Sequence, residues 1–309
     1  MNYQHAFHAG NFADVHKHVV LARILTHLRG KPAAFRVIDS HAGGGRYDLL
    51  GDRASRSGEW RGGIARLWAE RQEPAAVRPA PAEEGKVAAL LAPYLDAVAA
   101  LNPGGRLRVY PGSPLIAGAL MRPQDRLVAA ELEPRAAASL QGALRGDRRA
   151  KVLALDGWTA LGANVPPKER RGVVLLDPSF EESADFHRLS AGLAAAQRKW
   201  PTGIYLLWYP IKDREAPDAL ARRLVRLGVP KILRGEIMLD RPRADAGLIG
   251  SGLVIVNPPF TLQDELKILQ PALARLFSPD ASHHIDWLAR EKSPGRPKEK
   301  QPTPRSTGG

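Results

Sequence analysis

Seven short runs of apolar and β-branched residues recur along the chain, and stretches with helical periodicity lie between them. Most of the runs are almost continuously apolar, as expected for strands that helices cover on both faces. Helical patterns such as those of residues 183–200 and 217–228 separate them. The runs are residues 35–39, 126–132, 151–156, 172–177, 203–209, 231–239 and 252–257. This alternation predicts an α/β fold with a seven-stranded, mostly parallel sheet.

The first two runs are unusually far apart. More than 80 residues separate them, whereas a simple strand–helix–strand unit needs roughly 30. We therefore expect a helical insertion subdomain at residues 50–108, with helices at 58–71 and 85–101 and a loop rich in proline and alanine at 74–82.

The rest of the chain is predicted to form one Rossmann-like domain, made of residues 1–49 and 109–290. A disordered basic tail is expected at 291–309, where charged residues, proline and glycine dominate. Directly after the insertion, Ser113 suits a helix N-cap and Pro114 the first helical position.

The chain is strongly basic, with a formal net charge of +13. Such a charge attracts polyanions, of which nucleic acid is the usual one, although a general preference for arginine would also produce it. The chain contains no cysteine, which excludes disulfides and thiolate metal sites. Neither a signal peptide nor a run of the roughly 20 apolar residues that span a bilayer is evident, so we expect a cytoplasmic protein without a membrane partner.

Acidic residues end several of the predicted strands. They are Asp39, Glu131, Asp156 and Asp177. In open α/β sheets, ligands bind beyond the carboxyl ends of the strands, so these acids are predicted to line one rim. Three glycines at 43–45 follow the first strand, yet neither a dinucleotide fingerprint nor a P-loop is present. A ligand without phosphate, such as S-adenosylmethionine, fits this loop better.

Two of these acids suit a nucleoside. Glu131 can accept hydrogen bonds from both ribose hydroxyls, and Asp156, which Gly157 follows, can accept one from the adenine amino group. Taken singly, each is equally consistent with a helix cap.

The segment Asp177-Pro178-Ser179-Phe180 predicts chemistry on an exocyclic amine. A carboxylate and a fixed backbone carbonyl that accept both N–H groups of adenine N6 would expose its lone pair for methyl transfer, and an aromatic ring can stack on the base. A helix-capping turn with a core phenylalanine is the alternative. The similar segment Asn257-Pro258-Pro259-Phe260 follows the last run and is predicted to be structural.

The N-terminal segment is polar for the start of a helix. Before the amphipathic stretch at 19–28, which Gly30 is expected to cap, it holds Tyr3, His5, His8, His16, Lys17 and His18. We interpret this segment as one that recognises nucleic acid and closes over the cofactor, with solvated histidines as the alternative. A metal is not predicted, because no known ligand spacing accompanies the histidines.

Taken together, these motifs closely resemble the ribosomal RNA large subunit methyltransferase J family. They include FHAGNFADVHKH, DSHAGGGRYDL, YPGSPLIA, AELEP, LLDPSF and SGLVIVNPPF, in order from residue 3 to about 290. The resemblance implies a Rossmann-like class I methyltransferase that uses S-adenosylmethionine to methylate N6 of one specific adenine in 23S ribosomal RNA.

Residue by residue, the resemblance implies Asp177 as the catalytic acid. The cofactor contacts that it implies are His18, His41, Ser113, Glu131, Asp156, Gly157 and Asp177. Tyr3, His5 and Lys17 match its N-terminal RNA-facing motif, and Pro178 and Phe180 would contact the target base. Ser179 and Phe180 stand where the family usually has Pro and Tyr, which puts the geometry and rate of the reaction in question.

We expect the partner to be 23S ribosomal RNA, either free of protein or in an early assembly intermediate, and the enzyme to be a monomer without a metal. A DNA adenine-N6 methyltransferase and a non-enzymatic RNA-binding protein that retains the fold are the alternatives. A nicotinamide oxidoreductase is disfavoured by the missing dinucleotide fingerprint.

Overall fold

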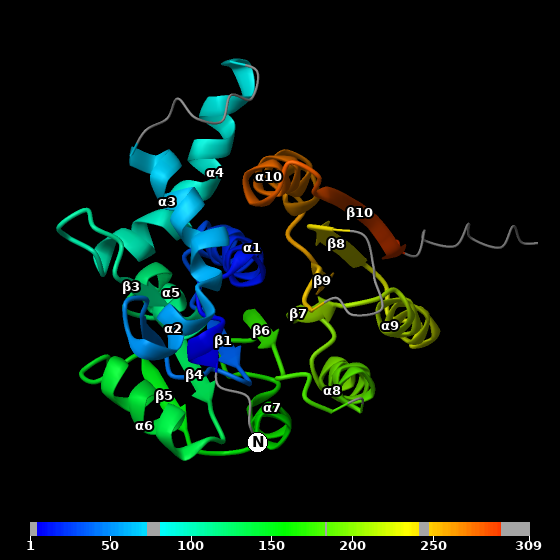
Figure 1. Cartoon of the computed structure of the whole chain (residues 1–309). Coiled ribbons are helices and arrows are strands. Elements are labelled where there is room, and N and C mark those ends of the chain that lie inside the picture. Colours follow the sequence, from blue (N-terminus) through cyan, green and yellow to red (C-terminus); the bar gives the residue numbers. More distant parts are fainter. Residues whose placement is uncertain (1–4, 73–80, 183, 241–246, 292–309) are drawn as a thin grey trace, which may run out of the picture.

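The computed structural model describes residues 5–72, 81–182, 184–240 and 247–291 (Figure 1). The strands of its main sheet are β1 (Arg36–Asp39), β4 (Arg126–Ala130), β5 (Ala150–Leu153), β6 (Gly172–Leu176), β7 (Ile204–Ile211), β8 (Ile232–Met238), β9 (Gly250–Val256) and β10 (Ser282–Ala289). They lie in the order β10-β8-β9-β7-β6-β1-β4-β5. From β5 to β7 the strands are parallel, whereas β9 is antiparallel to β7 and β8, and β10 is antiparallel to β8.

All seven predicted runs are strands, and the α/β class with a mostly parallel sheet is confirmed. The predicted number of strands is wrong, because the sheet has an eighth strand, β10. The sequence of β10, SHHIDWLA, lacks a continuous apolar run because an edge strand needs none, and its side chains are exposed or half-buried. A separate antiparallel pair, β2 (Arg46–Asp48) and β3 (Val109–Pro111), was also not predicted.

Helices cover both faces of the sheet. The helices are η1 (His5–Phe7), α1 (Phe12–Arg29), α2 (Asp52–Ser57), η2 (Glu59–Gly62), α3 (Ile64–Gln72), α4 (Pro81–Ala100), α5 (Ser113–Leu120), α6 (Pro134–Ala143), α7 (Gly157–Asn164), α8 (Asp185–Lys199), α9 (Glu215–Arg226) and α10 (Leu262–Phe277). Helices α1, α4, α5 and α10 belong to the hydrophobic cluster on one face, and α7, α8 and α9 to the cluster on the other (Figure 1).

Strand β6 explains why a continuous apolar run is needed. Val173 and Leu175 point into the first cluster, whereas Val174 and Leu176 point into the second, because successive side chains alternate between the faces of a sheet. Burying each such side chain contributes about 1.5–3 kcal/mol. The middle of β6 is therefore fixed from both sides, and so is the point at which the chain leaves it.

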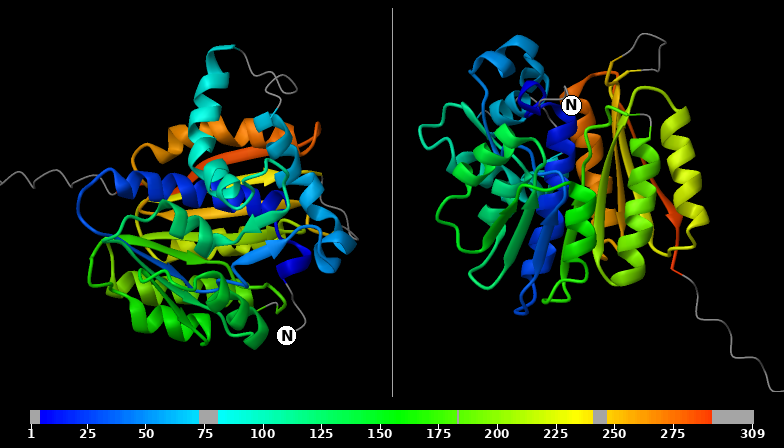
Figure 2. Two further views of the ribbon diagram at one scale, coloured as in Figure 1. Left: turned by 90° about the vertical axis from the view of Figure 1, so that its left-hand side faces the viewer. Right: turned by 90° about the horizontal axis from the view of Figure 1, so that it is seen from below.

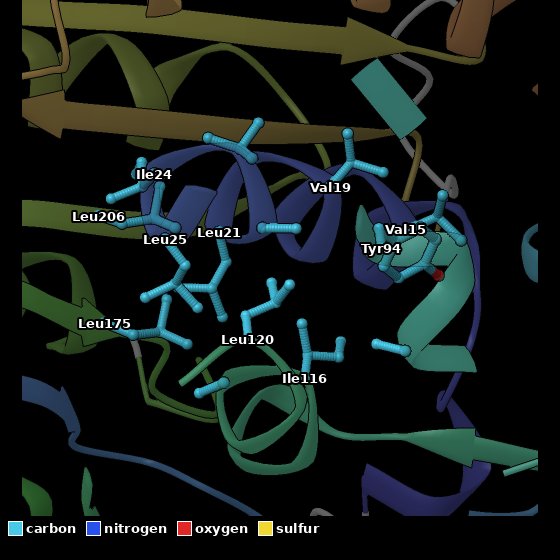
Figure 3. Packing of buried hydrophobic residues seen from close by; sticks show 14 of the residues in the cluster. Val15, Val19, Leu21, Ile24, Leu25, Tyr94, Ile116, Leu120, Leu175 and Leu206 are labelled. Atoms are coloured by element: carbon cyan, nitrogen blue, oxygen red, sulfur yellow. The ribbon is translucent and has the colours of Figure 1, made fainter. Parts of the chain in front are cut away.

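Helix α1 is the centre of the first cluster. Its apolar side chains pack against α4, α5 and the sheet, as Leu21 and Leu25 do beside Leu120 and Leu175 (Figure 3). The helix begins at Phe12, seven residues before the predicted stretch, and the Oδ1 of Asn11 caps it by accepting a hydrogen bond from the Asp14 N–H at 2.9 Å. His16, Lys17 and His18, which were assigned to a preceding segment, therefore lie inside the helix, whereas His5 and His8 do precede it.

Two expected helix caps differ in outcome. Helix α5 begins at Ser113 with Gly112 as its N-cap, so the N-cap role predicted for Ser113 is wrong. The Ser113 hydroxyl instead donates a hydrogen bond to Asp39 Oδ2 at 2.6 Å. Gly30 does cap α1, as predicted, and its N–H bonds the carbonyl of His27.

The segment between β2 and β3 carries helices α2, α3 and α4, so the expected helices of the insertion are present. Helix α4 packs beside α1 and α10 and shares their hydrophobic cluster, while its far end projects from the sheet (Figure 2). Most of the predicted loop at 74–82 and nearly all of the predicted tail at 291–309 lie outside the described residues. No helix in the described ranges is long and apolar enough to span a bilayer.

Candidate functional site

A cleft of about 790 Å³ opens at the carboxyl ends of the parallel strands. It lies between the glycine loop after β1, the turn after β6 and the N-terminal part of α1. All residues predicted to contact the cofactor line it: His18, His41, Ser113, Glu131, Asp156, Gly157 and Asp177. Residues that are far apart in the sequence thus converge at the carboxyl ends of the strands, as predicted.

The glycine loop is tightly folded against Glu131. Gly43 has a φ of +63°, and its N–H donates to Glu131 Oε2 at 2.8 Å. The N–H of Gly44 donates to the Tyr47 hydroxyl at 2.9 Å, and a Cβ on Gly43 would lie only 2.3 Å from that hydroxyl. Only glycine is therefore tolerated at position 43, and the loop backbone stands open to the cleft.

Asp156 fits the cofactor assignment and the helix-cap alternative at once. Asp156 caps α7, because its Oδ2 accepts hydrogen bonds from the N–H and the hydroxyl of Thr159. Asp156 also lines the cleft. A Cβ on Gly157 would come within 2.1 Å of the Ser40 carbonyl oxygen. The close approach of α7 to the β1 loop therefore requires glycine.

Asp39 departs from the predicted rim of acids. It is only 1% exposed and lies beneath the cleft rather than along its surface. Burial raises its pKa to about 7, although the hydrogen bond from Ser113 opposes that shift. Its Oδ1 has no hydrogen-bond partner within the described chain.

The turn after β6 is joined to α1 by a buried ion pair. The Lys17 ammonium lies between Asp14 Oδ1, at 2.9 Å, and Asp177 Oδ2. Burial alone would lower the pKa of Lys17, but the two carboxylates outweigh it and raise that pKa. His5 Nε2 lies 3.0 Å from Asp14 Oδ2, which extends the chain of contacts toward the cleft. Within the described residues Asp177 Oδ1 has no partner, so it remains available to a ligand.

Lys17 and the neighbouring histidines were predicted to face RNA and cofactor. Lys17 and His18 do line the cleft, although both, like His16, are almost fully buried. The Nδ1 of His18 lies 2.7 Å from the Tyr110 hydroxyl, and that of His16 lies 3.0 Å from the Ser251 hydroxyl. Burial lowers the pKa of both imidazoles to about 3, so both are neutral at pH 7. The alternative of solvated histidines is therefore wrong at these two positions.

His41 is also held in place. Its Nδ1 lies 2.8 Å from the Ser40 hydroxyl, and its ring packs edge-on against Trp158 at 5.0 Å. Burial lowers its pKa. His41 thus offers the cleft a neutral ring.

Phe180 is placed differently from the rest of its motif. Pro178 and Ser179 line the cleft, whereas Phe180 does not. Phe180 has a φ of +53°, and its ring packs against Phe186 at 4.8 Å and Trp208 at 5.5 Å. The packed phenylalanine of the alternative is therefore observed, whereas its helix-capping turn is not, because α8 begins at Asp185 with Ala184 as its N-cap.

Trp208 packs behind the site and was not assigned a role from the sequence. Its ring contacts Phe180 and lies 5.7 Å from the Lys17 ammonium, while its Nε1–H donates to the Ser251 hydroxyl at 3.0 Å. Its segment TGIYLLWYP resembles the family, but within this apolar strand nothing singled out Trp208. Tyr3, which was predicted to face RNA, lies outside the described residues.

The donor set of the cleft fits S-adenosylmethionine. A glycine-loop backbone beside Glu131, and Asp156 on the next strand, suit the hydroxyls and amine of a nucleoside. Within the described ranges, no group of histidines and carboxylates is arranged to bind a metal ion.

The parallel order β5-β4-β1-β6-β7, the antiparallel β9 between β7 and β8, and a cleft over the glycine loop define a Rossmann-like class I methyltransferase. The family model described as "Ribosomal RNA large subunit methyltransferase D, RlmJ" matches residues 32–289. The chain belongs to this ribosomal RNA large subunit methyltransferase J family, and it is a methyltransferase.

Individual relatives agree with this assignment. The chain is 37% identical over 293 residues to "Ribosomal RNA large subunit methyltransferase J" of Escherichia coli. The aligned region covers 94% of this chain and 100% of that protein. It is 36% identical to the protein of the same name from Haemophilus influenzae, with the same coverage. The crystal structure of protein LPL1258 from Legionella pneumophila superposes with a TM-score of 0.81 at 32% identity, over 91% of this chain and 98% of that one.

Proposed function

We propose that the enzyme methylates N6 of one specific adenine in 23S ribosomal RNA, with S-adenosylmethionine as methyl donor. The observation that carries this proposal is the position of Asp177 and Pro178, at the end of β6 and on the wall of the cleft. The net charge of +13 and the names of the relatives support ribosomal RNA as the substrate.

The chemistry follows from the available acceptors. Asp177 Oδ1 accepts one N–H of the adenine amine and the Pro178 carbonyl oxygen accepts the other, which turns the nitrogen lone pair outward. Lys17 holds Asp177 Oδ2 and thereby fixes the direction of Oδ1. We propose that Lys17 acts on the RNA through this contact rather than by touching it.

When bound, S-adenosylmethionine supplies a methyl group made electrophilic by a positively charged sulfur. We propose that Glu131 accepts hydrogen bonds from its ribose hydroxyls and Asp156 from its adenine amine. His18, His41, Ser113 and Gly157 complete the cofactor contacts that the family resemblance implies, while Asp177 stands between cofactor and base.

Tyr3, His5, Pro178 and Phe180 are proposed to contact the target RNA. His5 and Pro178 line the cleft, which supports this role. Stacking of Phe180 on the extracted base requires its ring to turn away from Trp208, since the two rings are in contact. We further propose that the enzyme is a cytoplasmic monomer and acts on RNA that is protein-free or at an early stage of assembly.

Incubation with a labelled methyl donor and either deproteinised ribosomal RNA or DNA tests the proposal. Label in 23S RNA at adenine N6, mapped by mass spectrometry to one position, is the expected result. Label only in DNA would identify a DNA methyltransferase, and RNA binding without saturable cofactor binding would identify a non-enzymatic protein.

A further inference from the structure

A second groove, of about 640 Å³, runs beside the cofactor cleft. Its walls are the β2–β3 pair, the segment 101–108 that ends the insertion, and helix α6. Arg46, Asp48 and Ser139 line both the groove and the cleft, so the two hollows are adjacent. A nucleic-acid chain bound in the cleft therefore needs to pass only these three residues to reach the groove.

The segment that forms the groove wall is held rigidly. The amide of Asn102 donates to the carbonyls of Val98 and Val109, both at 2.8 Å, and accepts from the N–H groups of Arg108 and Val109. The Trp68 Nε1–H donates to the Gly105 carbonyl at 2.9 Å. The side chains that this segment presents therefore start from a fixed backbone, which reduces the entropy cost of binding a ligand.

Three arginines face the groove with little to neutralise them. Within the described residues, the side chains of Arg46 and Arg106 make no hydrogen bond or ion pair, and Arg108 pairs with Asp48 at 3.3 Å, where both side chains are exposed. Burial alone would raise the pKa of Asp48, the carboxylate of the groove, but the charges of Arg108 and Arg46 both lower it. By contrast, the guanidinium of Arg149 bonds to two carbonyls and to Asp147. The groove thus carries an excess of positive charge that the protein itself does not satisfy.

We propose that this groove binds backbone phosphates of the RNA strand that flanks the target adenine. Guanidinium groups match phosphate oxygens in bidentate geometry, and a nucleic-acid backbone offers several phosphates in succession to the three arginines of one groove. The proposal rests on RNA being the substrate. It gives the insertion at 50–108 a function, because Arg106 and Arg108 are its last arginines.

The double variant Arg106→Ala/Arg108→Ala tests the groove, since neither residue lines the cofactor cleft. The matched control is Arg222→Ala/Arg226→Ala, which removes two arginines from α9, on the face of the sheet opposite α1. Affinity for a fluorescent 23S RNA fragment is measured by anisotropy over a salt series, and cofactor affinity is measured by calorimetry.

The groove variant should bind RNA about 10-fold more weakly at low salt. The slope of log affinity against log salt should fall by about 1–2, since each phosphate that the protein neutralises contributes roughly 0.7–0.9 to it. Cofactor affinity and kcat at saturating RNA should be unchanged, and the control should resemble the parent. Equal RNA affinity and salt slope in the two variants would overturn the proposal. Binding of polyglutamate is measured in the same way. If the groove variant binds polyglutamate more weakly than the parent but binds RNA equally well, the proposal is overturned in favour of an acidic protein partner.

The two proposals fail separately. If the parent protein binds the fragment through the groove but transfers no methyl group to RNA, the proposed function is wrong and the groove stands. If the parent methylates RNA and the groove variant matches it in KM and salt slope, the groove assignment alone is wrong.

Discussion

Two turns of nearly the same composition follow two fully buried strands, and only one of them faces the cleft. Asp177–Phe180 leaves β6, which runs parallel to β1, whereas Asn257–Phe260 leaves β9, which runs antiparallel to β7. Because β6 and β9 run in opposite directions, the two turns lie at opposite ends of the strands of this sheet. Strand direction, which the residues of the turn do not encode, decides which one meets the glycine loop.

The first residue of each turn shows the consequence. Asp177 bonds Lys17 across the cleft wall and keeps one oxygen available. Asn257, with a φ of +52°, donates its amide to the carbonyls of Pro201 and Gly203, both at 2.8 Å, and so ties the end of β9 to the start of β7. Asp177 thus presents an oxygen to the cleft, whereas Asn257 satisfies backbone groups.

The aromatic residues differ as well. Phe180 packs on Trp208 and Phe186, whereas Phe260 is 87% exposed and touches only the edge of the His27 ring among the ring contacts within the described chain. A shared aromatic position in two turns thus has two unrelated environments.

Asp177→Asn should show the largest difference in activity between the two turns. An amide offers one acceptor and one donor where two acceptors are required, so kcat should fall by about 10²–10⁴-fold. The fold should persist, because Lys17 keeps Asp14 as a partner. Steady-state methylation and a thermal melt measure the two effects, and activity within a few-fold of the parent would refute the role of Asp177.

Lys17→Met tests whether the ion pair positions the acid. The change keeps the apolar stem but leaves Asp14 and Asp177 without their shared cation, which should reduce kcat by about 10–100-fold. Removing one partner of a buried pair should also cost about 3–5 kcal/mol of unfolding free energy. Urea denaturation and single-turnover rates check both values. Unchanged single-turnover rates would show that Asp177 needs no partner.

Changes at the two ends of the strands should also affect the pH dependence of stability differently, because the buried Asp39 lies beneath the end that carries Asp177. The pKa of Asp39 is raised to about 7, so from pH 4 to pH 7 the folded state binds more protons than the unfolded state. The Asp39 contribution to stability should therefore fall as pH rises through this range, by up to about 1.4 kcal/mol per pH unit. The lowered pKa values of His16 and His18 act in the opposite direction below about pH 6.5, because there the unfolded state binds more protons at these two residues. Asp39→Asn should remove only the Asp39 contribution, so the unfolding free energy measured in urea should rise more steeply with pH than in the parent, whereas Asn257→Ala should leave the slope unchanged.

Asn257→Ala should have the smallest effect on activity, within about 2-fold, and should lower stability by about 1–2 kcal/mol, because two backbone carbonyls no longer accept its amide. Asn257→Gly separates the causes, because glycine keeps the positive φ at little cost. If Gly restores the stability of the parent, backbone conformation rather than the amide explains the effect. A large decrease of kcat in either variant would contradict the structural role of this turn.

The sequence predicted the elements that depend on local pattern. Continuous apolar runs revealed β6 and β9, since burial on both faces demands them. Strand β10 was missed because none of its residues is fully buried, which leaves polar residues such as His283, His284 and Asp286 along it and no continuous apolar run.

The acids that line the cleft were found because strand ends are visible in the sequence. The partners of α1 were not, because Lys17 and Asp177 are 160 positions apart and His16 and Ser251 are 235 apart. Reading polar residues as exposed placed the start of α1 too late.

These distances bear on how the enzyme is made. Helix α1 leaves the ribosome before the strands that it pairs with, so Lys17 gains Asp177 only after β6 is synthesised, and His16 gains Ser251 only with β9. Contacts of such long range form late in folding. The nascent chain therefore completes the ion pair at the cleft wall only after β6 has emerged, and the polar contacts of α1 only after β9.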